Sequence, residues 1–124
     1  AVGRYHLTSG DLDPNLLYDL LPEAISRLEA VLIKLHELNP EARIIYVGLF
    51  NPFYDLDETR VTNEIIQEWN MRAYRMINRY PNMTLVPVID LFQNSINRYL
   101  ASDHFHPNDA GYIRIAERVV QALE

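Results

Sequence analysis

The chain has 124 residues, of which 48% are hydrophobic and 23% are charged, and its formal net charge is -6. These values are typical of a folded globular domain, and the acidic balance argues against nucleic acid or an anionic membrane surface as a partner. The absence of cysteine excludes disulfides and thiolate metal sites. No apolar run approaches the roughly 20 residues that a membrane span requires.

The first predicted element is a long helix that follows Pro14. Between positions 16 and 38, leucine and other apolar residues recur at spacings of three and four. Pro22 falls inside this pattern. Since proline fits the first turn of a helix better than its interior, we expect the helix to start or restart there. Asn39 and Pro40 then end the helix.

Two apolar runs, residues 43–49 and 84–88, predict strands that are buried on both faces, as in a parallel sheet. Between them lie a loop at 50–60 and an amphipathic helix. The apolar face of that helix consists of Val61, Ile65, Ile66, Trp69, Ala73, Met76 and Ile77. The charged residues of the loop are expected to be solvated: Asp55, Asp57, Glu58 and Arg60.

After the second strand, residues 90–101 predict an irregular or short helical connection. Asn108 is a good N-cap for the last helix, which is expected to bury the following apolar residues: Tyr112, Ile113, Ile115, Ala116, Val119, Val120 and Leu123. Strands separated by helices indicate crossover connections and a parallel sheet. Two strands cannot form a sheet that is covered on both faces. We therefore expect about half of a three-layer α/β/α sandwich, completed by another segment or by a second copy of the chain.

The segment Asp103-His104-Phe105-His106-Pro107-Asn108 carries the most chemical information. A carboxylate three residues before a histidine can hold the imidazole in one tautomer, so that it acts as a general base. Pro107 keeps His106 extended and outside the following helix. His106 could also be a surface or capping residue. His104 and His106 with Asp103 and Asp109 could bind a metal, but alternate residues of an extended loop point apart.

This D-x-x-H-P-N block, followed by Gly111 and an apolar helix, resembles the last conserved block of the SGNH (GDSL-type) ester hydrolases. Asn51-Pro52-Phe53 after a buried strand, and the segment Tyr80-Pro81-Asn82-Met83-Thr84-Leu85-Val86-Pro87-Val88, are similar to a lipase/acylhydrolase branch of that family. The resemblance runs from about residue 14 to the C-terminus. It implies the flavodoxin-like SGNH fold, a three-layer α/β/α sandwich with a parallel sheet, of which residues 1–124 form one domain that is the C-terminal portion.

The resemblance implies a serine ester hydrolase with a Ser-His-Asp triad, in which His106 and Asp103 are the histidine and the aspartate. The family's G-D-S, glycine and G-x-N-D blocks have no counterpart here. Ser9-Gly10-Asp11 has the letters of the first block in another order, and no G-x-S-x-G elbow is present. The sequence also begins without an initiator methionine. We therefore expect the nucleophilic serine on an upstream segment, and this chain by itself to be inactive.

Phe50, Asn51, Pro52 and Phe53 follow the carboxyl end of a predicted parallel strand, where open α/β sheets bind ligands. They are candidates to bind the substrate, an ester with an acyl chain or an acetylated small molecule; alternatively, the phenylalanines pack the loop against the next helix. No cofactor or metal is implied. A secreted or cell-envelope location in a bacterium and a cytoplasmic one both stay open. The alternative to an esterase is a non-catalytic α/β module for binding or oligomerisation.

Overall fold

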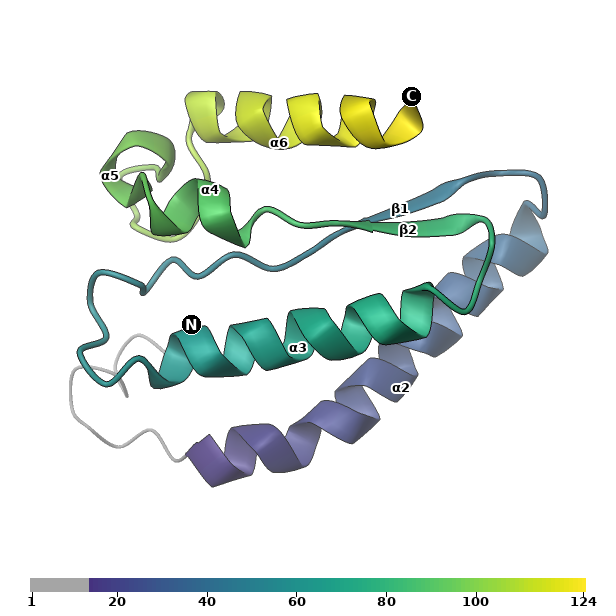
Figure 1. The fold of residues 1–124 in the computed structure, drawn as a ribbon, viewed down its shortest axis with the longest axis horizontal. Coiled ribbons are helices and arrows are strands. Elements are labelled where there is room, and N and C mark those ends of the chain that lie inside the picture. The colour runs from purple at the N-terminus through teal and green to yellow at the C-terminus, as the bar shows by residue number, and fades with distance from the viewer. Residues whose placement is uncertain (1–13) are drawn as a thin grey trace.

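The computed structural model describes residues 14–124, which alternate between helices and strands (Figure 1). The elements in chain order are α2 (Pro14–Leu38), β1 (Ile44–Val47), α3 (Val61–Ile77), β2 (Met83–Val86), α4 (Ile89–Gln93), α5 (Ile96–Tyr99) and α6 (Asp109–Leu123). Both predicted strands and the short helical connection are confirmed, but the expected burial on both faces is wrong for β1, whose residues are only partly buried.

The two strands form a parallel sheet in which Ile44 is paired with Met83 and Val47 with Val86. The loops that follow both strands, together with the start of α6, lie at the same end of the molecule (Figure 1). The parallel topology predicted from the element order is therefore confirmed, and it brings the two candidate site segments to one end of the sheet.

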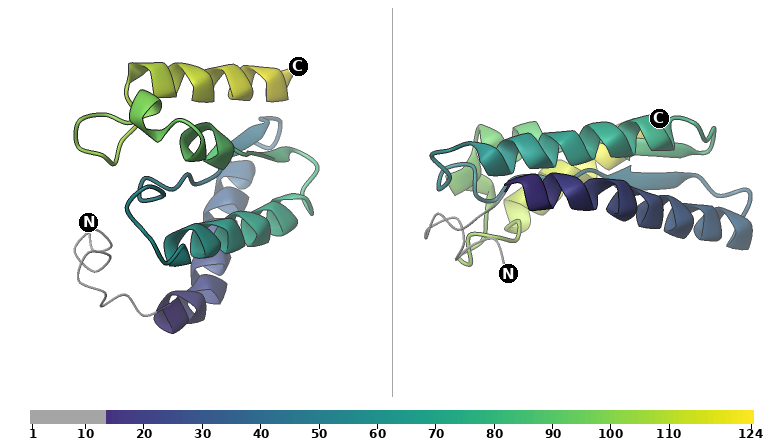
Figure 2. Two further views of the ribbon diagram at one scale, coloured as in Figure 1. Left: turned by 60° about the vertical axis from the view of Figure 1, so that its left-hand side comes forward. Right: turned by 90° about the horizontal axis from the view of Figure 1, so that it is seen from below.

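The helices lie in two layers on opposite faces of the strands. Figure 2 shows α6 on one side of the sheet and α2 with α3 on the other. Arg118 ties α6 to α4 and to the residue after β2, because its guanidinium binds both carboxylate oxygens of Asp90 at 2.5 and 2.6 Å and the carbonyl of Pro87 at 3.0 Å. The hydrogen bonds from Arg118 to the carboxylate hold the pKa of Asp90 below its usual value. At the far end of α6, Arg43 donates to the carbonyls of Ala122 and Leu123.

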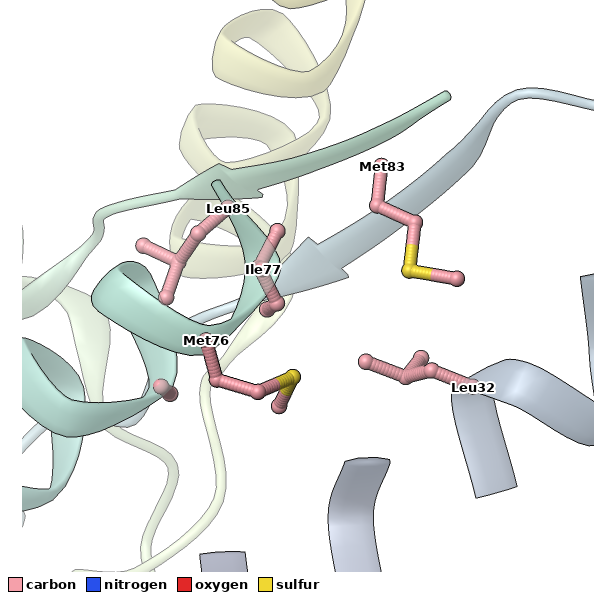
Figure 3. Close-up of a cluster of buried hydrophobic side chains, with 6 residues drawn as sticks. Leu32, Met76, Ile77, Met83 and Leu85 are labelled. Carbon is pink, nitrogen blue, oxygen red and sulfur yellow. The ribbon is translucent and has the colours of Figure 1, made fainter. Parts of the chain in front are cut away.

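A buried apolar cluster joins α2 and α3 to the sheet. Its members are Leu32, Ala73, Met76, Ile77, Met83 and Leu85. Figure 3 shows Leu32 of α2 reaching toward Met76 of α3 and Met83 of β2. The three- and four-residue spacing puts these helix residues on one face, so the sequence pattern and the packing agree here.

The helix boundaries differ from the prediction at Pro22. The helix neither starts nor restarts there, since α2 runs without interruption from Pro14 to Leu38. A proline inside a helix removes one hydrogen bond to the preceding turn. The other backbone bonds of this 25-residue helix and the packing of its apolar face outweigh that loss.

The prediction that α6 buries its seven apolar residues is wrong: Ala116 is exposed, Ile115 and Val119 are only partly buried, and the other four are largely exposed. The exposed fractions are 54% for Tyr112, 60% for Ile113, 55% for Val120 and 49% for Leu123. The described sheet has two strands, which is too narrow to cover the whole apolar face of a 15-residue helix. Among residues 14–124, no helix has the length and the apolar character needed to cross a membrane.

Candidate active site

The candidate histidine lies in a loop between α5 and α6, which we call the His loop (residues 101–107). Leu100 and Pro107 form an antiparallel bridge at its base. The amide of Ala101 donates to the carbonyl of His106 at 2.8 Å, and the amide of Asn108 donates to the carbonyl of Tyr99 at 2.8 Å. Backbone hydrogen bonds alone therefore hold the two ends of the loop together.

Asp103 is the organising residue of the His loop. Its Oδ1 accepts the amides of Phe105 and His106 at 2.9 and 3.0 Å, and its Oδ2 lies 2.6 Å from Nδ1 of His106. The hydrogen bond from the His106 ring, and then those from the two amides, lower the pKa of Asp103 to about 2. The carboxylate is therefore ionised at neutral pH.

The tautomer of His106 follows from this contact. An ionised carboxylate only accepts hydrogen bonds, so in the neutral imidazole Nδ1 carries the proton and Nε2 has the lone pair. No hydrogen bond from residues 14–124 reaches Nε2, and the His106 side chain is 63% exposed. The ring of Phe105 stands edge-on to the imidazole, with 5.0 Å between centroids. His106 is thus oriented as a base whose proton-accepting nitrogen is accessible.

Asn108 and Gly111 connect the His loop to α6. The Oδ1 of Asn108 accepts the amide of Gly111 at 2.8 Å, which is the N-cap bond predicted from the sequence, and its Nδ2 donates to the carbonyls of Arg98 and Leu100. A Cβ added at Gly111 would lie 2.5 Å from the carbonyl oxygen of Tyr99. Glycine is required here because α6 begins directly against the backbone of α5.

The four residues predicted to bind substrate divide into two groups. Phe50, Pro52 and Phe53 line an apolar cavity of about 590 Å³ that also contains His106. Asn51 is not among the lining residues; it is buried, its Nδ2 donates to Thr62 Oγ1, and its Oδ1 accepts the amide of Phe53. Asn51 therefore shapes the loop from within.

The cavity lies beside the carboxyl end of β1. Its walls come from β1 and the loop after it, from α3, and from the His loop and α6: Val47, Gly48, Leu49, Phe50, Pro52, Phe53, Ile66, Phe105, His106, Pro107, Tyr112 and Ile115. A second apolar cluster, formed by Val88, Leu91, Phe92, Ile96 and Leu100, supports this end of the molecule. Phe50 stacks on Phe92 with a centroid distance of 4.1 Å, so it takes part in the packing and also lines the cavity.

Asp57 contradicts the prediction that the charged residues of loop 50–60 are solvated. It is buried, and its carboxylate accepts the amides and the hydroxyls of Thr59 and Thr62. Burial by itself raises the pKa of Asp57, but these hydrogen bonds outweigh it and keep the pKa below its usual value. The spacing D-x-T-x-x-T was the available signal, because short hydroxyl residues near an aspartate favour such local bonds.

Within residues 14–124, neither a nucleophile for His106 nor a metal site is found. Ser26 lies on α2, Ser95 precedes α5 and Ser102 lies in the His loop, and none of them is hydrogen-bonded to His106 in this part of the chain. Ser9 lies outside the described residues. No three histidine or carboxylate side chains gather in the described range as metal ligands would.

Comparison with known proteins places these features in a wider context. Residues 7–114 match the family described as GDSL-like Lipase/Acylhydrolase. The chain is 36% identical over 101 residues to the uncharacterized protein YpmR of Bacillus subtilis (strain 168), an alignment that covers 79% of this chain and 40% of that protein. It is 24% identical over 98 residues to the GDSL esterase/lipase At1g23500 of Arabidopsis thaliana, covering 79% of this chain and 25% of that one.

Two solved structures share the fold. The lipase Lip_vut3 from a goat rumen metagenome superimposes with a TM-score of 0.80 at 18% identity, over 98% of this chain and 58% of that one. A protein from Streptococcus pneumonia titled as a putative platelet activating factor gives a TM-score of 0.66 at 22% identity, over 84% and 52% of the two chains. The present chain thus spans less than two thirds of each of these proteins.

Proposed function

Because this chain belongs to the GDSL-like lipase/acylhydrolase family, we propose that it supplies the histidine and the aspartate of a Ser-His-Asp triad in an ester hydrolase. The supporting observation is the Asp103–His106 pair. Three hydrogen bonds fix the carboxylate, and the contact at 2.6 Å leaves Nε2 of the imidazole as the accessible base. This is the orientation that activation of a serine hydroxyl requires.

In the proposed reaction, Nε2 of His106 accepts the proton of the serine hydroxyl while the serine oxygen attacks the carbonyl carbon of the ester. The same proton is then given to the leaving alcohol as the acyl-enzyme forms. A water molecule, deprotonated by His106 in the same way, releases the acid and regenerates the serine. Asp103 stays ionised throughout and stabilises the transient imidazolium.

We further propose that the serine lies on a segment that extends the sheet at β1. The amides of Ile44 and Gly48 donate toward β2. Because directions alternate along a strand, the backbone groups of Ile45 and Val47 face the opposite edge, where no strand of the described range is paired. An unpaired, apolar parallel edge is unfavourable in water.

Asn70 supports this location for the additional strand. Its side-chain amide donates to the carbonyl of Leu49 at 2.9 Å and accepts the amide of Leu49 at 2.9 Å. The free part of the edge therefore ends at Leu49, close to the cavity that contains His106. A strand beside Ile45 and Val47 would deliver a residue at its carboxyl end to that cavity.

We propose that the substrate is an ester whose acyl chain occupies the apolar cavity. An added strand beside β1 would cover the wall at Val47, and we expect the acyl group to lie against Phe53, Phe105 and His106. Phe50 and Pro52 extend the apolar wall from the same loop. The net negative charge of the chain and the apolar lining of the cavity both favour a neutral, apolar acyl group.

A fluorophosphonate probe tests the proposal on the full-length protein that contains this chain. The proposal expects an adduct on a serine outside residues 1–124, and loss of labelling in His106→Ala but not in the control Ser102→Ala. An adduct on Ser9, Ser26, Ser95 or Ser102 contradicts the location of the nucleophile. Labelling that does not depend on His106 contradicts its role as the base. No adduct on any chain favours the non-catalytic module, and an adduct that needs two copies of the chain favours self-association.

A further inference from the structure

The His loop contacts the loop after β1 (residues 50–60) through the two residues that precede His106. The Nε2 of His104 lies 2.9 Å from Oδ1 of Asp55, and the rings of Phe105 and Phe53 lie 6.1 Å apart at an angle of 56°. The contact between His104 and Asp55 joins residues 49 positions apart in the sequence. It is thus a tertiary contact between the two loops that border the apolar cavity.

The backbone at this contact is in a conformation that needs support. Among residues 14–124, the non-glycine residues with positive φ are His104, at 55°, and Arg60, at 63°. One lies in each of the two loops. A non-glycine residue keeps a backbone conformation in the left-handed region only where surrounding contacts hold it. For His104 these contacts are the bond to Asp55 and the hydrogen bond from its amide to the carbonyl of Ala101 at 3.0 Å.

The two histidines of the loop have separate partners. His106 is bound to Asp103, and His104 is bound to Asp55. The side chain of His104 is 26% exposed and that of Asp55 is 34% exposed. Since a carboxylate only accepts, Nε2 of His104 is committed as a donor. Of the two histidines, His106 lines the apolar cavity and His104 does not, so we assign His104 a contribution to geometry.

We propose that His104 and Asp55 form a latch that positions the His loop against loop 50–60 and thereby sets where Nε2 of His106 lies relative to a substrate in the cavity. His104 and Asp55 are thus positioning residues, which act through His106. This inference rests on the proposed function, because the position of His106 matters for turnover only if His106 is the base.

Two variants of His104 distinguish the contact with Asp55 from the alternative that position 104 only needs a residue suited to a left-handed backbone. In the full-length protein, His104→Gln keeps an N–H donor at about the reach of Nε2, whereas His104→Asn has a shorter side chain but suits the left-handed region better. The latch predicts that kcat for a p-nitrophenyl ester falls roughly tenfold in His104→Asn, below the ~10²-fold cost of a 1 Å misplacement. His104→Gln should retain most of the activity, with KM little changed in both. The reverse order of the two variants overturns the proposal.

The partner is tested by Asp55→Ala, with Glu58→Ala as the matched control, since Glu58 is an exposed carboxylate on the same loop. We expect Asp55→Ala to lower kcat roughly as much as His104→Asn, and the double variant to lower it no further, because two residues that act as one contact are not additive. Losses that multiply in the double variant, or an equal loss in Glu58→Ala, contradict the latch.

Amide hydrogen exchange separates this inference from the proposed function. The amides of Phe105 and His106 donate to Asp103, and the latch predicts that they exchange faster in His104→Asn and in Asp55→Ala than in His104→Gln. If His106→Ala retains turnover, the proposed function fails while the exchange result still reports on the latch. If exchange is unchanged in both latch variants, the latch is wrong whatever His106 does.

Discussion

The His loop and the free edge of β1 lie at the same end of the molecule and are built in opposite ways. Hydrogen bonds hold the His loop: the amides of Phe105 and His106 donate to the carboxylate of Asp103, and the side chain of Asn108 bonds three backbone groups. The edge of β1 leaves Ile45 and Val47 unpaired in the described range, between helices with exposed apolar residues. One region is organised within the chain, whereas the other has an edge that no strand of the described range pairs with.

The difference indicates which part of the chemistry is local. A general base can be oriented by residues three positions away, because an aspartate reaches the imidazole and the intervening amides at once. The proposed nucleophile and acyl pocket, in contrast, involve segments that are distant in the sequence. The four predictions below test this contrast, from the largest expected effect to the smallest.

The largest effect is expected for Asp103→Asn in the full-length protein. The substituted amide can donate to Nδ1 and so favour the tautomer in which Nε2 carries the proton, which removes the base. We expect turnover to fall by about 10²–10⁴-fold, the usual contribution of general base catalysis. The test is to measure kcat/KM for a p-nitrophenyl ester, with Asp109→Asn as the control. A loss below threefold in Asp103→Asn would mean that Asp103 does not orient His106.

The cluster between α2, α3 and the sheet offers a matched pair of leucines. Leu32 is 4% exposed and Leu35 is 48% exposed on the same helix. Leu32→Ala leaves a cavity and should lower the free energy of unfolding by about 2–5 kcal/mol. Leu35→Ala should cost less than about 1 kcal/mol, measured by urea unfolding. An equal cost for Leu35→Ala in the full-length protein would show that another segment buries this face.

Gly111→Ala tests how tightly α6 is joined to the His loop. The added Cβ meets the backbone carbonyl of Tyr99 at 2.5 Å, whereas in the control Gly48→Ala the nearest atom is the side-chain oxygen of Asn70 at 3.2 Å. Overpacking against backbone costs about 1–3 kcal/mol. Thermal unfolding should therefore show a clearly larger drop in Tm for Gly111→Ala; equal values would mean that α6 can shift away from α5.

The smallest effect concerns stability in acid. The pKa of Asp103 is lowered to about 2 in the folded chain, below its unfolded value of about 3.9. Its ionised form therefore favours folding above that unfolded value, and the contribution is lost as pH falls from about 4 toward 2. Urea midpoints across this range should decline less steeply in Asp103→Asn than in the unmodified protein. Parallel curves would mean that the carboxylate is not held as described.

The sequence alone predicted the features that depend on local spacing. The apolar runs identified both strands, the three- and four-residue period identified α2, α3 and α6, and Asn108 identified the cap of α6. The resemblance of the D-x-x-H block located Asp103 and His106, whose contact is equally local. The prediction that the helix starts or restarts at Pro22 is wrong, since Pro22 lies inside α2. The free energy of one lost hydrogen bond is small compared with that of packing the whole helix.

Only the tertiary structure decided which side chains are covered and which loops meet. It buried Asp57 and Asn51, and it left Tyr112 and Ile113 exposed. It also joined His104 to Asp55 across 49 positions. The physical reason is that periodicity tells which residues share a face, whereas burial depends on the width of the sheet that the face meets. Contacts between loops depend in turn on where parallel strands deliver their carboxyl ends.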